Sequence, residues 1–310
     1  MYQSFFKLRS LPFGSSPDPR FLYVTPQVRE MLAGLQYGIA ARKGFVVLTG
    51  EVGTGKTASL NTVLSTFNKD RVSTVMVVNP IFEVNDFLEY VLVDFGIRPE
   101  SRTKSGMLIQ LNNWLMERYR HNAVCALIVD EAQNLSWELL EEIRLLTNLE
   151  TSSEKLLQVV LSGQPELEEK LRDPRVRQLR QRVSLWCRTR PLTVEETHAY
   201  IAERLRIAGA STPLFLPEAI DLISESSRGI PRLINLICDN ALVNAYGEQV
   251  QPVPPRIVEE VCQDHDLNPG PLQEPPKAYG HKEPPATTGT LPISVRTSRR
   301  SVSVGKDHTL

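Results

Sequence analysis

The stretch Gly50-Glu51-Val52-Gly53-Thr54-Gly55-Lys56-Thr57 decides how the rest of the chain is interpreted. It fits the pattern G-x-x-x-x-G-K-[ST] of a phosphate-binding loop. The apolar, β-branched run Phe45–Thr49 precedes it, and residues 58–64 can open a helix after it. Glycines let the backbone curl so that successive N–H groups face one anion, and a helix N-terminus adds a favourable dipole. The stretch therefore predicts a strand, a phosphate loop and a helix in succession.

This loop is expected to hold ATP and Mg²⁺. Lys56 would reach the β- and γ-phosphates, and the Thr57 hydroxyl would bind Mg²⁺. The residues expected to contact the nucleotide are Gly50, Glu51, Val52, Gly53, Thr54, Gly55, Lys56, Thr57 and Ala58.

Composition narrows the class of protein further. The chain has 310 residues, of which 41% are hydrophobic and 23% charged, as in ordinary globular proteins. A net charge of -1 gives no global field for nucleic acid or anionic membranes, so such binding would need a local patch. The four scattered cysteines form no C-x-x-C pair, and no signal region or long apolar run is present. We expect a reduced, cytoplasmic protein without membrane insertion.

Apolar runs alternate with helical patterns between residues 28 and 187, which predicts an α/β fold. Strands are expected at 45–49, 72–78, 123–129, 156–163 and 183–187, and helices at 28–42, 86–95, 107–119 and 137–149. Such alternation is typical of a parallel sheet covered by helices on both faces, with ligands at the carboxyl ends of the strands.

Four segments with different compositions suggest the domain organisation. Residues 1–26 are aromatic and Pro-rich and are expected to form an ordered arm close to the nucleotide; residues 27–191 form the ATPase core. Residues 192–266 predict a small all-helical lid, with helices beginning near Thr193, Pro217, Pro231 and Pro255. Residues 267–310 lack apolar periodicity and are expected to be a disordered Pro-rich tail.

Polar residues follow two of the predicted strands. Asp130 and Glu131 come directly after the buried run 123–129, at the expected edge of the phosphate loop. Asp130 would hold Mg²⁺, and Glu131 would orient the attacking water. Gln164 follows the next strand and could hydrogen-bond the γ-phosphate or the water, with Ser162 as the alternative and a plain turn before Pro165 as the alternative without a function.

Seven arginines lie between residues 172 and 190, and three interpretations stay open. They could be a solvated basic face, a phosphate-contacting patch for nucleic acid, or a subunit interface that inserts one arginine into a neighbouring ATP site. The position before the last strand favours the interface, with Arg182 as first candidate and Arg180 as second. Arg232, which follows Gly229-Ile230-Pro231, is expected to face the nucleotide from a lid helix.

Together these features resemble an AAA+ ATPase and, more narrowly, the ExeA/GspA family of secretion-associated ATPases. The resemblance covers about residues 1–265. Its selective parts are Phe5-Phe6-Lys7-Leu8, Pro12-Phe13, Pro17-Asp18-Pro19, Phe21-Leu22-Tyr23, Gly44-Phe45, Asp130-Glu131-Ala132-Gln133, Gly163-Gln164-Pro165-Glu166-Leu167, Leu179 to Val183, and Gly229-Ile230-Pro231-Arg232.

The resemblance implies an ATP-hydrolysing core and lid that assemble with copies of themselves into a ring or filament, with ATP at the subunit contacts. It implies sensor roles for Gln164 and Arg232 and a trans-acting role for Arg182. The partner would be a protein of an envelope or secretion complex whose assembly the ATPase drives. Related transposition regulators of the TnsC/TniB type oligomerise on DNA, so a DNA-bound regulator is the alternative.

Overall fold

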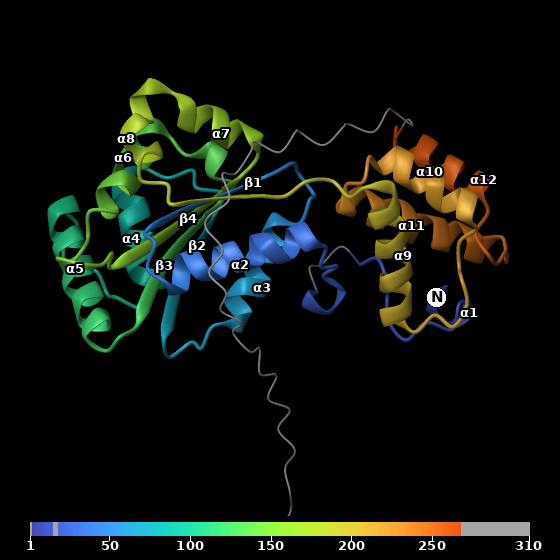
Figure 1. Ribbon diagram of the computed structural model, residues 1–310, viewed down its shortest axis with the longest axis horizontal. Helices are drawn as coiled ribbons and strands as arrows, with labels where there is room; N and C mark the ends of the chain where they lie inside the picture. Colours follow the sequence, from blue (N-terminus) through green and yellow to red (C-terminus); the bar gives the residue numbers. More distant parts are fainter. Residues whose placement is uncertain (1, 15–17, 268–310) are drawn as a thin grey trace, which may run out of the picture. The chain divides into compact units, whose positions relative to one another are not determined.

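The structure, a computed structural model, describes residues 2–14 and 18–267 (Figure 1). The disordered tail expected over 267–310 therefore lies outside the described residues, apart from its first residue.

A five-stranded parallel sheet forms the centre of the larger α/β part. Its strands are β1 (Phe45–Thr49), β2 (Val72–Val78), β3 (Val124–Asp130), β4 (Leu157–Gly163) and β5 (Leu185–Arg188). The strand order is β2-β3-β4-β1-β5, and every pairing is parallel. Thr49 lies opposite Gly163, so the phosphate loop and the residues after β4 leave the sheet at the same edge.

Helices cover both faces of this sheet, which confirms the predicted fold class (Figure 1). The alternation is visible within β1: Phe45 and Val47 belong to one apolar cluster, and Val46 and Leu48 belong to the other. One face carries α2 (Pro26–Ala40) and α3 (Lys56–Thr66). The other carries α4 (Val84–Asp94), α5 (Lys104–Arg120), α6 (Trp137–Leu146), α7 (Pro165–Arg172) and α8 (Arg177–Arg180).

A third apolar cluster lies among the helices after residue 192. These are α9 (Val194–Ala208), α10 (Pro217–Ser227), α11 (Pro231–Gly247) and α12 (Pro255–Asp264). The arm contributes to the same cluster through α1 (Tyr2–Phe5) and the buried rings of Phe6, Phe13 and Phe21. Burial of these rings accounts for the order of a segment that has almost no regular structure of its own.

Local capping fixes where several helices begin. Thr25 accepts a hydrogen bond from the Val28 amide before α2, and Ser136 accepts one from Leu139 before α6. Thr193 and Glu196 form a capping box at the start of α9, where a helix was predicted to begin.

Several details differ from the prediction: the bounds of α2, α4 and α5 are shifted by a few residues, and the short helix α8 was not predicted. Helix α7 was not predicted, although Pro165 at its first position and two glutamates in its first turn are ordinary start signals. Helix α6 ends at Leu146 rather than Leu149. Strand β5 begins at Leu185 rather than Val183 because residues 181–183 complete the turn after α8. Within the described residues, no helix has the length and apolar character needed to cross a membrane.

Candidate functional site

The phosphate loop connects a fully buried strand to a helix whose first turn has no side-chain cap. All five residues of β1 are buried, and Gly55, the residue before α3, has a left-handed φ of 94°. A side chain at Gly55 would be strained by this φ, and Gly53 has a similar φ of 83°. The uncapped N–H groups at the start of α3 are the donors that an anionic phosphate needs.

Lys56 folds back over the loop. Its ammonium donates hydrogen bonds to the carbonyls of Gly50, at 2.7 Å, and Glu51, at 3.0 Å. Burial lowers the pKa of Lys56, while the carboxylates of Glu131 and Asp130 oppose that shift. The amine therefore lies inside the loop, beside the two carboxylates predicted to act with it.

Asp130 joins three elements at the sheet edge. It is 2% exposed, accepts a hydrogen bond from the Thr57 hydroxyl at 2.7 Å, and accepts another from the Ser162 hydroxyl at 2.7 Å. Ser162, the alternative to Gln164, thus orients Asp130 from the neighbouring strand.

The donor set around Thr57 and Asp130 fits Mg²⁺. A hydroxyl and a carboxylate, both hard oxygen ligands, lie in contact here and would hold the cation. Among the described residues there is no group of three or more Asp, Glu, His or Cys side chains that could hold a metal ion. The pair of Thr57 and Asp130 suits Mg²⁺, which takes one or two protein ligands and completes its shell with water and phosphate oxygens.

Glu131 is held by two amides. It sits in a left-handed conformation, with φ of 53°, at the end of β3. Its Oε2 accepts hydrogen bonds from Gln133 Nε2, at 2.6 Å, and Gln164 Nε2, at 3.2 Å. The Gln133 hydrogen bond lowers the pKa of Glu131; burial opposes it, and Gln164 adds to the lowering. The carboxylate is therefore charged at neutral pH and fixed in direction.

Gln133 was missed as a site residue in the sequence analysis. Its Nε2 donates to Glu131, and its Oε1 accepts a hydrogen bond from the backbone N–H of Gln164 at 3.1 Å. A Cβ on Gly163 would lie 2.8 Å from the same oxygen. The spacing Glu131-x-Gln133 was the available signal, but the two side chains meet only because of the turn at Glu131.

The lid approaches the loop through Arg232. Its backbone amide donates to the Gly53 carbonyl at 3.2 Å, and a Cβ on Gly53 would lie 2.8 Å from the Arg232 Cβ. Arg232 lines the same cavity, about 730 Å³, as Lys56 and Thr57. The predicted residues on this cavity are Val52, Gly53, Thr54, Gly55, Lys56, Thr57, Ala58, Glu131 and Arg232. The other predicted residues, Gly50, Glu51, Asp130, Ser162 and Gln164, do not line this cavity.

The arginine segment divides into residues at the cavity and residues away from it. Arg188 and Arg190 line the cavity, where Arg188 pairs with Glu168 at 2.8 Å and Arg190 pairs with Glu196 at 2.6 Å. Neither arginine was predicted to line the cavity.

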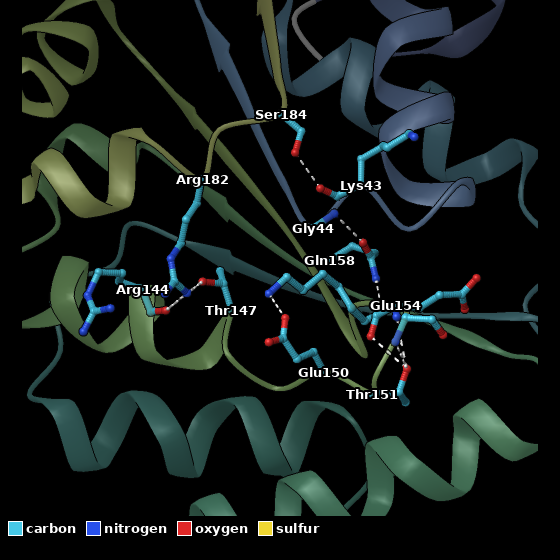
Figure 2. Close-up of polar contacts among 12 residues, drawn as sticks. Lys43, Gly44, Arg144, Thr147, Glu150, Thr151, Glu154, Gln158, Arg182 and Ser184 are labelled. Carbon is cyan, nitrogen blue, oxygen red and sulfur yellow. Dashed lines mark hydrogen bonds and ion pairs between the residues drawn. The ribbon is translucent and has the colours of Figure 1, made fainter.

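Arg182 lies at the end of α6 instead (Figure 2). Its guanidinium donates to the Arg144 carbonyl, at 3.1 Å, and to the Thr147 hydroxyl, at 2.6 Å. This contact satisfies acceptors at a helix C-terminus, where a cation is favoured. Arg180, the second candidate, is exposed. Neither arginine lines the cavity of its own chain.

Comparisons with known proteins agree with this architecture. A family model described as an AAA domain matches residues 39–171. Two solved structures are similar in fold: the Drosophila ORC bound to DNA and the ORC2 protein of Aeropyrum pernix in ADPNP–ADP complexes. The first has a TM-score of 0.66 at 18% identity and covers 86% of this chain and 66% of that one. The second has a TM-score of 0.59 at 14% identity and covers 82% and 71%. The fold and site together define an AAA+ nucleotide-binding domain.

A sequence relative narrows the class. General secretion pathway protein A of Aeromonas hydrophila is 42% identical over 247 residues, which cover 79% of this chain and 45% of that protein. This chain therefore spans less than half the length of that relative. The chain belongs to the ExeA/GspA family of AAA+ ATPases.

Proposed function

We propose that the chain binds MgATP in the cavity between the phosphate loop and Arg232 and hydrolyses it. The observation that carries the proposal is the Glu131 carboxylate, charged and aimed by two amides, in the same cavity as Lys56. The ADPNP–ADP complexes of the Aeropyrum pernix ORC2 protein are a precedent for nucleotide in this fold.

Each group would have one part in the reaction. The N–H groups of the loop and the Lys56 ammonium would bind the phosphates, and Thr57 and Asp130 would hold Mg²⁺. When bound, Mg²⁺ supplies positive charge to the β- and γ-phosphate oxygens. Glu131 would orient the attacking water, and Gln164 would fix Glu131 and sense the γ-phosphate. Arg232 would place the positive charge of its guanidinium, carried by the lid, beside the nucleotide.

We further propose that copies of the chain assemble, with ATP at the subunit contact, so that hydrolysis drives or switches assembly of a macromolecular complex. The relative named general secretion pathway protein A supports a secretion- or envelope-associated complex with a protein partner. In this proposal an arginine of residues 172–190, Arg182 or Arg180, completes the ATP site of the neighbouring copy.

A second function, a DNA-bound transposition regulator, is favoured by a different observation. Arg172, Arg177 and Arg180 are exposed on one short segment, and the similar Drosophila ORC structure has DNA bound. Exposed arginines of this kind can contact phosphates in a salt-dependent manner.

ATP turnover with and without double-stranded DNA at two salt concentrations tests the proposal, with Lys56→Ala as the blank. We expect turnover that the blank lacks and that DNA does not change. Strong stimulation that disappears at the higher salt would replace the secretion-associated function with the DNA-bound one. Equal turnover by the blank would contradict the ATPase assignment itself.

A further inference from the structure

A buried arginine of the lid, Arg204, is left without a part in the proposed reaction. It lies in the middle of α9, is 8% exposed, and appears in no ion pair among the described residues. A buried guanidinium is costly unless neutral acceptors and aromatic faces replace its water. The groups that contact the Arg204 guanidinium therefore show which part of the chain this side chain holds in place.

Those contacts reach across to the N-terminal arm. Arg204 Nε donates to the Pro12 carbonyl at 2.6 Å, and Nη1 donates to the Phe21 carbonyl at 3.5 Å and to the Tyr200 hydroxyl at 2.9 Å. The guanidinium also lies 4.8 Å from the centre of the Phe21 ring and 5.9 Å from that of Phe13. One lid side chain thus holds the arm at two points that are nine residues apart in sequence.

The segment held in this way forms part of the nucleotide cavity. Phe13, Phe21, Leu22 and Tyr23 line the cavity together with Tyr200 and Arg204 themselves. These aromatic and apolar groups are chemically unlike the loop around Lys56, which suits phosphates. An aromatic wall suits the flat base and the sugar of a nucleoside.

Two further contacts attach the start of the arm to the lid without involving Arg204. The Arg9 amide donates to the Ala208 carbonyl at 2.7 Å, and the Tyr2 hydroxyl donates to Asp239. Removing the Arg204 contacts would therefore loosen the cavity wall while these contacts still hold the start of the arm.

We infer that Arg204 is a positioning residue for nucleoside binding: by holding the Pro12 and Phe21 carbonyls it keeps the arm in place as the wall that contacts the base and sugar. The inference rests on the proposed ATP site. It predicts that replacing Arg204 weakens the part of the ATP affinity that comes from the base and sugar. The part that comes from the phosphates should stay unchanged.

Calorimetric titration of the whole chain with MgATP and with magnesium tripolyphosphate separates the two contributions. The variants are Arg204→Lys, which keeps the charge but not the planar fork of donors, and Arg204→Met. Arg206→Met is the matched control, because Arg206 lies two residues along α9, is exposed, and pairs only with Glu203 among the described residues. For the Arg204 variants we expect MgATP to bind about tenfold more weakly, the loss of one charged hydrogen bond. Tripolyphosphate affinity should be unchanged.

Two results would overturn the inference. One is wild-type MgATP affinity in both Arg204 variants. The other is an equal loss for MgATP and tripolyphosphate, which would assign Arg204 to the general stability of the lid. Failure of the wild-type chain to bind MgATP would contradict the proposed function itself, so the two failures are distinguishable.

Limited trypsin digestion gives a second measurement that does not depend on ligand affinity. Arg20 is exposed on the arm, one residue before Phe21, and offers a cleavage site. We expect Arg204→Lys to be cleaved there faster than wild type while its circular dichroism stays unchanged, and Arg206→Met to be cleaved at the wild-type rate. Cleavage of Arg204→Lys at the wild-type rate would contradict the proposed hold on the arm.

Discussion

At the scale of single residues, the chemistry of the site depends on how Glu131 is held. A lone carboxylate after a strand can turn toward solvent, whereas this one accepts hydrogen bonds from both Gln133 and Gln164. Both amides favour the charged form, and both restrict the direction in which the carboxylate can polarise a water.

Replacing Gln133 tests this arrangement through the pH dependence of turnover. The Gln133 hydrogen bond lowers the pKa of Glu131, so Gln133→Met lets that pKa rise. Because the carboxylate is the active form, the acid limb of the kcat profile should move to higher pH. At neutral pH we expect turnover to fall about tenfold, the equivalent of one charged hydrogen bond.

Asn134→Ala is the control for this experiment, since the Asn134 side chain is exposed and hydrogen-bonds only to Asn79 among the described residues. A Gln133→Met profile that keeps the wild-type acid limb would show that Gln133 does not set the ionisation of Glu131.

The sequence sufficed for Lys56, Thr57, Asp130 and Glu131 as candidates, because a local motif and a buried strand place them. It did not suffice for Gln133, whose contact requires the left-handed turn at Glu131. That conformation is uncommon for a residue with a side chain and leaves no pattern in the sequence.

At the scale of elements, the backbone before α9 lies in close contact with the turn before α11. The Leu192 amide donates to the Gly229 carbonyl at 2.8 Å, and Gly229 has a left-handed φ of 70°. A Cβ at Gly229 would lie 2.0 Å from the Leu192 carbonyl oxygen. The Gly-Ile-Pro-Arg motif therefore needs its glycine for space as well as for conformation.

Gly229→Ala should lower the free energy of unfolding by at least about 2 kcal/mol, because the side chain is strained and meets backbone that cannot give way. Urea denaturation measures this. Gly247→Ala at the end of α11, where a Cβ meets nothing within 4 Å, should instead leave stability unchanged or raise it by up to about 1 kcal/mol. Equal stability of the two variants would contradict the close-contact account.

Helix α7 shows why one element escaped prediction. No helix was predicted to begin at Pro165, whereas helices were predicted to begin near Pro217, Pro231 and Pro255, and all four prolines stand at the first position of a helix. The helix is short, and its two buried leucines, Leu167 and Leu171, are too few to show a period.

At the scale of the whole molecule, the candidate cavity is bounded by arm, core and lid together. The arm was predicted from composition to be ordered and close to the nucleotide. Its detailed course depends on distant partners such as Arg204, which no local pattern in residues 1–26 specifies.

The trans-acting arginine is tested by mixing subunits. In a head-to-tail assembly, an Arg182→Ala subunit keeps its own Lys56, and a Lys56→Ala subunit keeps its own Arg182. Random equal mixing then restores about a quarter of the interfaces, so partial recovery of turnover is expected. Light scattering confirms that mixed oligomers form.

The same mixture with Arg180→Ala separates the two candidates. Recovery with Arg180→Ala but not with Arg182→Ala would transfer the role to Arg180 and leave Arg182 as a cap of α6. No recovery in either mixture, with oligomers present, would contradict a trans-acting arginine at both positions.

The most direct test of the central claim, ATP hydrolysis directed by Glu131, is to measure ATP binding and turnover of Glu131→Gln in parallel. The substitution keeps the size of the side chain and removes its charge. The account predicts wild-type ATP affinity with turnover reduced at least about a hundredfold, because a neutral amide cannot polarise the water. Turnover at the wild-type rate would contradict the assignment of Glu131 and the account of the site built around it.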